Sequence, residues 1–433
     1  MRRLTGLPGI SRQQHDTNRS FDILWFMGGG SRWHPFFIAN VDATTSADLH
    51  FVPGRNSMTS QTPIRKPRGR DLGIPFTGCT GPHNAITDVD GVGVGFQTII
   101  ENEPRPGRKR PVRSGVTAIL PHMQSETPVP VYAGVHRFNG NGEMTGTHWI
   151  ADGGYFLGPV VITNTHGIGM AHHATTRWMV DHYASTYKTD DFLWIMPVIA
   201  ETYDGVLNDI NCFPVTEADV RKALDSVASG PVQEGNCGGG TGMITYGFKG
   251  GTGTASRVVE FGGRSFTIGA LVQANHGQRD WLTIAGVPVG QHMRDGTPQS
   301  QLQERGSIIV VLATDLPLMP HQLQRLARRA AIGIGRNGTP GGNNSGDIFL
   351  AFSTANQRPM QHRSAPFLQM EVVNDEPLDP FYLAAVDSVE EAVVNAMLAA
   401  EDMGGTPYDR LRVQAIDHDR LREVLARYGR LSA

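Results

Sequence analysis

The fold is decided by the stretch Gly306-Ser-Ile-Ile-Val-Val-Leu-Ala-Thr-Asp315. Six apolar residues follow Ser307 without interruption, and such a run is typical of a strand that is buried on both faces. The segment before it, residues 297–305, is polar and rich in Gln. Ser307 is therefore expected where a polar loop enters a core strand.

Outward from this stretch, short apolar runs broken by Gly, Asp and Asn predict strands at 92–96, 115–120, 158–163 and 266–272. Helical periodicity predicts helices at 216–228, 322–332 and 388–400, the first with a capping box formed by Thr216 and Asp219. Grouped strands with helices between them favour an α+β architecture, in which helices cover sheets, over regular alternation of strand and helix.

The chain of 433 residues contains no linker-like segment, which favours one large domain at 67–433. Residues 1–66 have few periodic apolar positions and a basic end, so we expect an N-terminal extension that is poorly ordered. The formal net charge of −3 offers no basic field, so neither nucleic acid nor a membrane is expected as a partner. The absence of a long apolar run or a continuous signal-peptide core predicts a cytoplasmic location.

The residues that commonly bind metals are scattered. Cys79, Cys212 and Cys237 are far apart and form no CxxC pair, which argues against a disulfide framework and against a structural zinc site. The histidines lack carboxylate or cysteine partners at metal-ligand spacing. No metal site is predicted.

The pair Gly306-Ser307 has two interpretations. In the first, it is only a turn that leads into the strand. In the second, glycine leaves its carbonyl unshielded, the Ser307 hydroxyl attacks it, the acyl group moves from N to O, and hydrolysis releases a new N-terminus. The freed α-amine of Ser307, with an ordinary pKa near ~7.7 to 8.0, then serves as the general base that a serine hydroxyl needs.

Several longer segments carry a family resemblance. Residues 306–322 resemble the processing site of the DmpA-type L-aminopeptidase/D-amidase-esterase and β-peptidyl aminopeptidase family. Other segments that are similar to this family are Asn84-Ala-Ile-Thr-Asp-Val-Asp-Gly-Val92, Gly238-Gly-Gly-Thr-Gly-Met243 with Gly247-Phe-Lys-Gly-Gly251, Gln273-Ala-Asn-His-Gly277, and Ser345-Gly-Asp-Ile-Phe-Leu-Ala-Phe-Ser-Thr-Ala-Asn356. Together these segments span roughly residues 67–420.

This resemblance implies a four-layer αββα sandwich of the DmpA and ornithine acetyltransferase type, similar to the Ntn hydrolases. It implies a precursor that cuts itself between Gly306 and Ser307 into a large and a small subunit, which stay together in a homotetramer. Ser307 is then the nucleophile, the substrates are small peptides, amides and esters, and no cofactor or metal takes part.

The resemblance also assigns Ser345 and Asp347 as a second serine and its acidic partner. Residues i and i+2 of a strand point to one face, so these side chains are able to meet. Taken without the resemblance, residues 343–346 read as a hairpin turn in which Asp347 binds backbone amides.

Tyr203 and Asn275 match the family's neutral donors to the oxyanion, which is the charge that acyl transfer develops. Gly238, Gly239 and Gly240 are expected to bring backbone close to the substrate, although the bare pattern also fits an ordinary loop.

The sequence therefore predicts a self-cleaving serine aminopeptidase that releases N-terminal residues through an ester on Ser307. Two alternatives stay open. One is an acyltransferase of the related ornithine acetyltransferase fold, although that family uses threonine as its nucleophile. The other is an uncut, non-catalytic scaffold.

Overall fold

The computed structural model describes residues 66–103, 105–186, 193–297, 306–360, 364–408 and 411–432, together with the backbone of two strands nearer the N-terminus. Those strands, β1 (Ile23–Met27) and β2 (Trp33–Phe37), pair antiparallel with each other. The chain divides into two compact units, Met1–Ile64 and Arg65–Ala433. The prediction of a poorly ordered extension falls mostly outside the described residues and stays a prediction.

The larger sheet of the second unit has six strands in the order β11-β12-β13-β14-β5-β6. Neighbouring strands are antiparallel except for β13 and β14, which are parallel. Every residue of β13 is buried, as the apolar run after Ser307 predicts. The strands are β5 (Pro130–Arg137), β6 (Tyr155–Leu157), β11 (Gly251–Phe261), β12 (Arg264–Asn275), β13 (Ser307–Thr314) and β14 (Ile348–Ser353).

The smaller sheet has four strands in the order β3-β4-β7-β8. Its strands are β3 (Gly93–Glu101), β4 (Val112–Leu120), β7 (Val160–Asn164) and β8 (Val198–Thr202). Side chains of both sheets share one buried apolar cluster, to which Ile119 and Ile162 contribute from the smaller sheet and Leu271 and Val311 from the larger. The two sheets therefore pack face to face.

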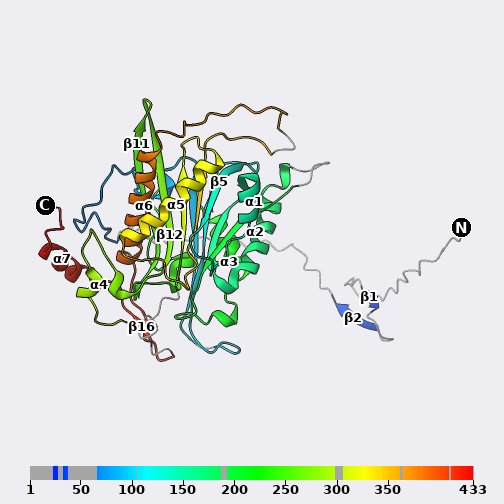
Figure 1. The fold of residues 1–433 in the computed structure, drawn as a ribbon. Coiled ribbons are helices and arrows are strands. Elements are labelled where there is room, and N and C mark those ends of the chain that lie inside the picture. Colours follow the sequence, from blue (N-terminus) through cyan, green and yellow to red (C-terminus); the bar gives the residue numbers. More distant parts are fainter. Residues whose placement is uncertain are drawn as a thin grey trace, which may run out of the picture. The chain divides into compact units, whose positions relative to one another are not determined.

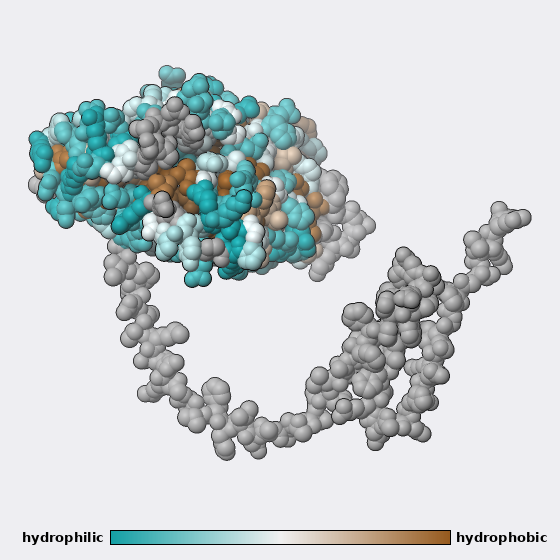
Figure 2. Space-filling model, turned by 90° about the horizontal axis from the view of Figure 1, so that it is seen from below, coloured by the Kyte–Doolittle hydropathy of each residue, from teal (hydrophilic) through white to brown (hydrophobic). Residues whose placement is uncertain are grey.

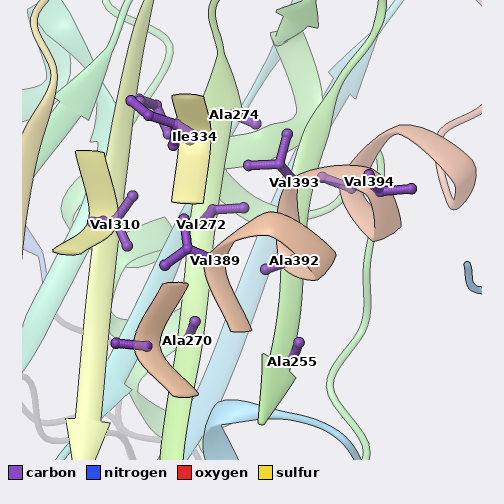
Figure 3. Packing of buried hydrophobic residues seen from close by; sticks show 14 of the residues in the cluster. Ala255, Ala270, Val272, Ala274, Val310, Ile334, Val389, Ala392, Val393 and Val394 are labelled. Carbon is purple, nitrogen blue, oxygen red and sulfur yellow. The ribbon is translucent and has the colours of Figure 1, made fainter. Parts of the chain in front are cut away.

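Two long helices, α5 (Pro320–Arg336) and α6 (Asp379–Leu398), cover the outer face of the larger sheet (Figure 1). Figure 3 shows side chains of both helices, among them Ile334 and Val389, packed against residues of β12 and β13 such as Val272 and Val310. This helix layer forms one outer side of the sandwich.

The outer face of the smaller sheet is covered by α2 (Ile168–His182) and α3 (Glu217–Asp225). Met179 of α2 and Val220 of α3 share a buried cluster with Val161 of β7. The four layers thus follow the order helix, sheet, sheet, helix, and the predicted αββα sandwich is confirmed.

The remaining elements are short. β9 (Ile244–Thr245) and β10 (Phe248–Lys249) form a hairpin beside the end of β12, and β15 (Met403–Gly404) pairs with β16 (Arg412–Val413). The other helices are α1 (Thr147–Gly153), α4 (Val289–His292) and α7 (His418–Arg427), with 3₁₀ turns η1 (Ile86–Asp88), η2 (Thr165–Gly167), η3 (Ala184–Thr186), η4 (Ile210–Cys212), η5 (Gly238–Gly242) and η6 (Arg279–Trp281).

The face in Figure 2 is largely hydrophilic, with apolar surface near its middle. Within the described ranges, none of the helices combines the length and the apolar character needed to cross a membrane.

Candidate active site

Ser307 is the first residue of β13 and lies between two neighbouring strands, β12 and β14. In the antiparallel register it stands opposite Asn275, the last residue of β12. The Ser307 side chain is buried, and its Oγ accepts a hydrogen bond from the Gly346 N–H at 3.2 Å. A backbone donor from the segment before β14 therefore already contacts the hydroxyl oxygen.

The residue before the serine has no room for a side chain. A Cβ placed on Gly306 would lie 1.8 Å from the carbonyl oxygen of Asn275 and 2.9 Å from the Cα of His276. Non-bonded atoms do not approach to 1.8 Å, so glycine at this position is required by the closeness of the β12 end.

The side chains of Ser345 and Asp347 are in hydrogen-bond contact, as expected. β14 begins only at Ile348, so both residues lie just before the strand and not within it, which corrects the strand-based reasoning for their spacing. The Ser345 hydroxyl nevertheless donates to Oδ1 of Asp347. The same oxygen accepts the N–H of Ile308 at 3.1 Å, so the pair is tied to the residue that follows Ser307.

The turn interpretation of this segment is also correct in part. The Ser345 N–H donates to the carbonyl oxygen of Gly342 at 3.0 Å, which closes a turn, and Asp347 binds a backbone amide, that of Ile308. A turn and a pair of interacting side chains therefore coexist in residues 342–347.

Burial raises the pKa of Asp347 above its ordinary value, while hydrogen bonds from Ser345, from the Ile308 N–H and from Asn139 favour the charged form. Asn139 Nδ2 donates to Oδ2 of Asp347 at 3.2 Å. Sequence reasoning missed Asn139, because its setting, Phe138-Asn-Gly-Asn-Gly142, has the composition of any turn.

Asn275 is held at both ends of its amide. Its Oδ1 accepts the N–H of Ile244 at 2.8 Å, and its Nδ2 donates to the carbonyl oxygen of Tyr203 at 2.9 Å. Because one partner can only donate and the other can only accept, the orientation of the amide is fixed. The Tyr203 carbonyl uses one of the two Nδ2 hydrogens, and contact of the second with a substrate stays a prediction.

Tyr203 joins this arrangement through its backbone carbonyl. The residue is 42% exposed, and its ring lies close to Gly205, where an added Cβ would be 2.3 Å from the phenol oxygen. Contact between the Tyr203 hydroxyl and a reacting carbonyl stays a prediction.

The three glycines of the predicted substrate loop are buried in η5. A Cβ on Gly239 would lie 2.1 Å from Oε1 of Gln273, and one on Gly240 would lie 2.3 Å from the backbone nitrogen of Thr252. Gly238 is equally crowded, with an atom of a neighbouring side chain at 2.5 Å from its Cβ position. Close packing of η5 therefore explains the glycines, and contact with substrate stays a prediction.

Within the part of the chain that the structure describes, no group of three or more His, Cys, Asp or Glu side chains is arranged to hold a metal ion. The polar groups around Ser307 are hydroxyls, amides and one carboxylate. This set suits acyl transfer by a serine, with neutral donors for the developing negative charge.

Comparison with known proteins agrees with this chemistry. The model of peptidase family S58 matches residues 84–410. Beta-peptidyl aminopeptidase BapA of Sphingosinicella microcystinivorans is 48% identical over 381 residues, a match that covers 85% of this chain and 94% of the relative.

Two solved structures are similar. L-aminopeptidase D-Ala-esterase/amidase from Ochrobactrum anthropi, described as a prototype of the serine aminopeptidases and a new variant of the Ntn hydrolase fold, matches with 91% identity and a TM-score of 0.82 over 85% of this chain and 100% of its own. The β-aminopeptidase of a Burkholderia species matches with 43% identity and a TM-score of 0.74 over 84% of this chain and 99% of its own. The chain therefore belongs to peptidase family S58 and is a hydrolase of the aminopeptidase class with an Ntn-hydrolase fold.

Proposed function

We propose that the chain cuts itself between Gly306 and Ser307 and that the freed Ser307 is the nucleophile of a serine aminopeptidase. The observation that carries this proposal is the setting of Ser307. Its buried hydroxyl stands at the start of a central strand, directly after a glycine that admits no side chain, and its oxygen accepts the Gly346 N–H.

In the first stage, Oγ of Ser307 attacks the carbonyl carbon of Gly306. The C–N bond then breaks, the acyl group becomes an ester on Oγ, and the nitrogen takes up the hydroxyl proton to become an α-amine. Water hydrolyses the ester, which leaves a carboxylate on Gly306 and a free hydroxyl on Ser307.

In the second stage, the α-amine of Ser307 accepts the Oγ proton while Oγ attacks the substrate carbonyl. The second Nδ2 hydrogen of Asn275 donates to the oxyanion, because the amide is already fixed by Ile244 and Tyr203. One such preorganised donor is worth roughly 2.7–4 kcal/mol. The leaving amine takes the proton, and water then cleaves the ester. The Tyr203 hydroxyl is the second proposed donor.

Ser345 and Asp347 support the charge on the α-amine. Because the Ser345 hydroxyl donates its hydrogen to Asp347, its oxygen is left as an acceptor, which suits the Ser307 ammonium. The Asp347 carboxylate, itself held by the Ile308 N–H, stabilises the same positive charge.

The pairing of strands supports lasting association of the two fragments. β13 pairs with β12 and β14 pairs with β5, so the segment that begins at Ser307 shares one sheet with the segment that ends at Gly306. The family resemblance adds a homotetramer, which light scattering of the purified protein tests.

The substrate class is small peptides, amides and esters. Two similar proteins carry names that support it, one a β-peptidyl aminopeptidase and the other an L-aminopeptidase with D-Ala-esterase/amidase activity.

The test is a denaturing intact-mass spectrum of the wild type and of Ser307→Ala, with the exposed Ser265→Ala as the matched control. The wild type and the control are each expected to give two fragments, one ending at Gly306 and one beginning at Ser307, and to hydrolyse an L-alanyl anilide. Ser307→Ala is expected to stay uncut and inactive. A Ser307→Ala chain that splits at the same bond, or hydrolyses the anilide at the wild-type rate, refutes the proposal.

A further inference from the structure

Lys249 is a lysine without exposed surface. Its Nζ donates to the carbonyl oxygens of Gly250 at 2.7 Å, Met243 at 2.8 Å and Gly240 at 3.4 Å, which match the three hydrogens of an ammonium. Among the described residues, the charged or titratable neighbours that act on Lys249 are Cys237 and Lys66, and no carboxylate is among them. A buried cation without a counter-charge is costly, so its position calls for an explanation.

The hairpin of β9 and β10 puts the lysine in this place. Tyr246 and Gly247 form its two-residue turn, and both have positive φ, 51° and 70°, as in the type I′ turn that suits a tight hairpin. The register then places Lys249 opposite Ile244, so that its side chain reaches back to the carbonyl of Met243.

One peptide group connects this lysine to the proposed oxyanion donor. The carbonyl of Met243 and the N–H of Ile244 belong to the same peptide bond. The carbonyl accepts from Lys249 Nζ, and the N–H donates to Oδ1 of Asn275. Donation to the carbonyl makes the N–H a stronger donor, because hydrogen bonds in a chain polarise one another.

We propose that Lys249 is a positioning residue that orients and polarises Asn275 through the Met243–Ile244 peptide. A stronger bond to Oδ1 also makes the remaining Nδ2 hydrogen of Asn275 a better donor. This matters most when negative charge develops on the substrate oxygen, so the effect falls on kcat more than on KM. The inference rests on the proposed role of Asn275.

Burial lowers the pKa of Lys249 to about 7, and Cys237 opposes this shift while Lys66 adds to it. Burial therefore favours the neutral amine more than water does. The neutral amine still has two N–H donors for the same carbonyls, so the link to Asn275 persists in both forms.

A double-mutant cycle separates this role from simple stabilisation of the fold. Lys249→Met removes donors and charge, whereas Lys249→Gln keeps an N–H donor without the charge and replaces the Met variant if that variant does not fold. The exposed Lys222→Met is the matched control. Each variant is made in the wild type and in Asn275→Ala, and kcat for an L-alanyl anilide is expressed per cleaved chain.

We expect Lys249→Met to lower kcat about tenfold in the wild type, with KM nearly unchanged, and to lower it less than about twofold in Asn275→Ala. Lys249→Gln should lower kcat less than Lys249→Met does. Equal losses in both backgrounds, or no loss in the wild type, overturn the inference about Lys249. If Asn275→Ala alone leaves kcat unchanged, the proposed oxyanion role of Asn275 fails instead.

Discussion

Replacement of Gly306 by alanine tests the geometry at the scissile bond. The added Cβ would stand 1.8 Å from the carbonyl oxygen of Asn275. Carbon and oxygen atoms that are not bonded keep about 3.3 Å or more between them. The backbone around residue 306 must therefore move by roughly 1.5 Å, the difference between these two distances, or β12 must yield by the same amount.

A shift of this size acts on the reaction because Ser307 is the next residue. It would pull Oγ from its contact with the Gly346 N–H, which is already 3.2 Å long. A misplacement of about 1 Å can cost about 100-fold in rate, so we expect Gly306→Ala to slow self-cleavage about 100-fold. Overpacking of the strand end should also lower the free energy of unfolding by about 1–3 kcal/mol.

The assay is a time course of intact mass, in which the fraction of cut chain is followed after purification. Gly335→Ala is the matched control, because apart from its chain neighbours and the backbone of its own helix no described atom lies within 4 Å of the Cβ position of Gly335. If Gly306→Ala is cut as fast as Gly335→Ala, the close approach to Asn275 does not govern the reaction and the reasoning is wrong.

Two further predictions concern stability. Burial lowers the pKa of His276 to about 3. Between about pH 6.5 and pH 3 the unfolded chain therefore binds a proton at this histidine that the folded chain does not bind. The free energy of unfolding consequently falls as the pH falls through this range. His276→Phe should move acid unfolding, followed by circular dichroism, to lower pH, and an unchanged midpoint would contradict this. Glu391→Gln should lower the free energy of unfolding by about 3–5 kcal/mol, because it leaves the buried guanidinium of Arg257 without its counter-charge. In the wild type the Arg257 nitrogen lies 2.7 Å from the Glu391 carboxylate. Thermal unfolding measures this loss of stability. As a control, Asp280→Asn, which breaks the exposed ion pair with Arg294, should lower the free energy of unfolding by less than about 1 kcal/mol. Equal losses in the two variants would refute the argument.

The sequence predicted those elements whose signals are local. The helix expected at 216–228 is α3, and its capping box of Thr216 and Asp219 is present, although the helix ends at Asp225. The helix expected at 388–400 is α6, which begins much earlier, at Asp379. Its first turns bury Phe381, Ala384 and Ala385 at helical spacing, so a local apolar period is present there and the predicted start was placed too late.

The site residues divide into those that have a signal in the local sequence and those that depend on distant strand pairing. Spacing and the family resemblance picked out Ser307, Ser345 and Asp347, and the structure brings them together. Asn139 and the Gly346 N–H were missed, because their places depend on the pairing of β5 with β14 and of β13 with β14. A single sequence contains no local signal for the pairing of strands that lie about 40 residues apart in the chain, as β13 and β14 do, or more than 200 residues apart, as β5 and β14 do.

The place of β13 in its sheet also bears on how the protein can fold. All strands of that sheet except β13 and β14 precede Ser307 in the chain. After a cut at Gly306, unfolded fragments must first meet, so refolding becomes a second-order process and the melting temperature rises with protein concentration. In the uncut chain the two segments are covalently joined, so this encounter step and the concentration dependence that it adds are absent.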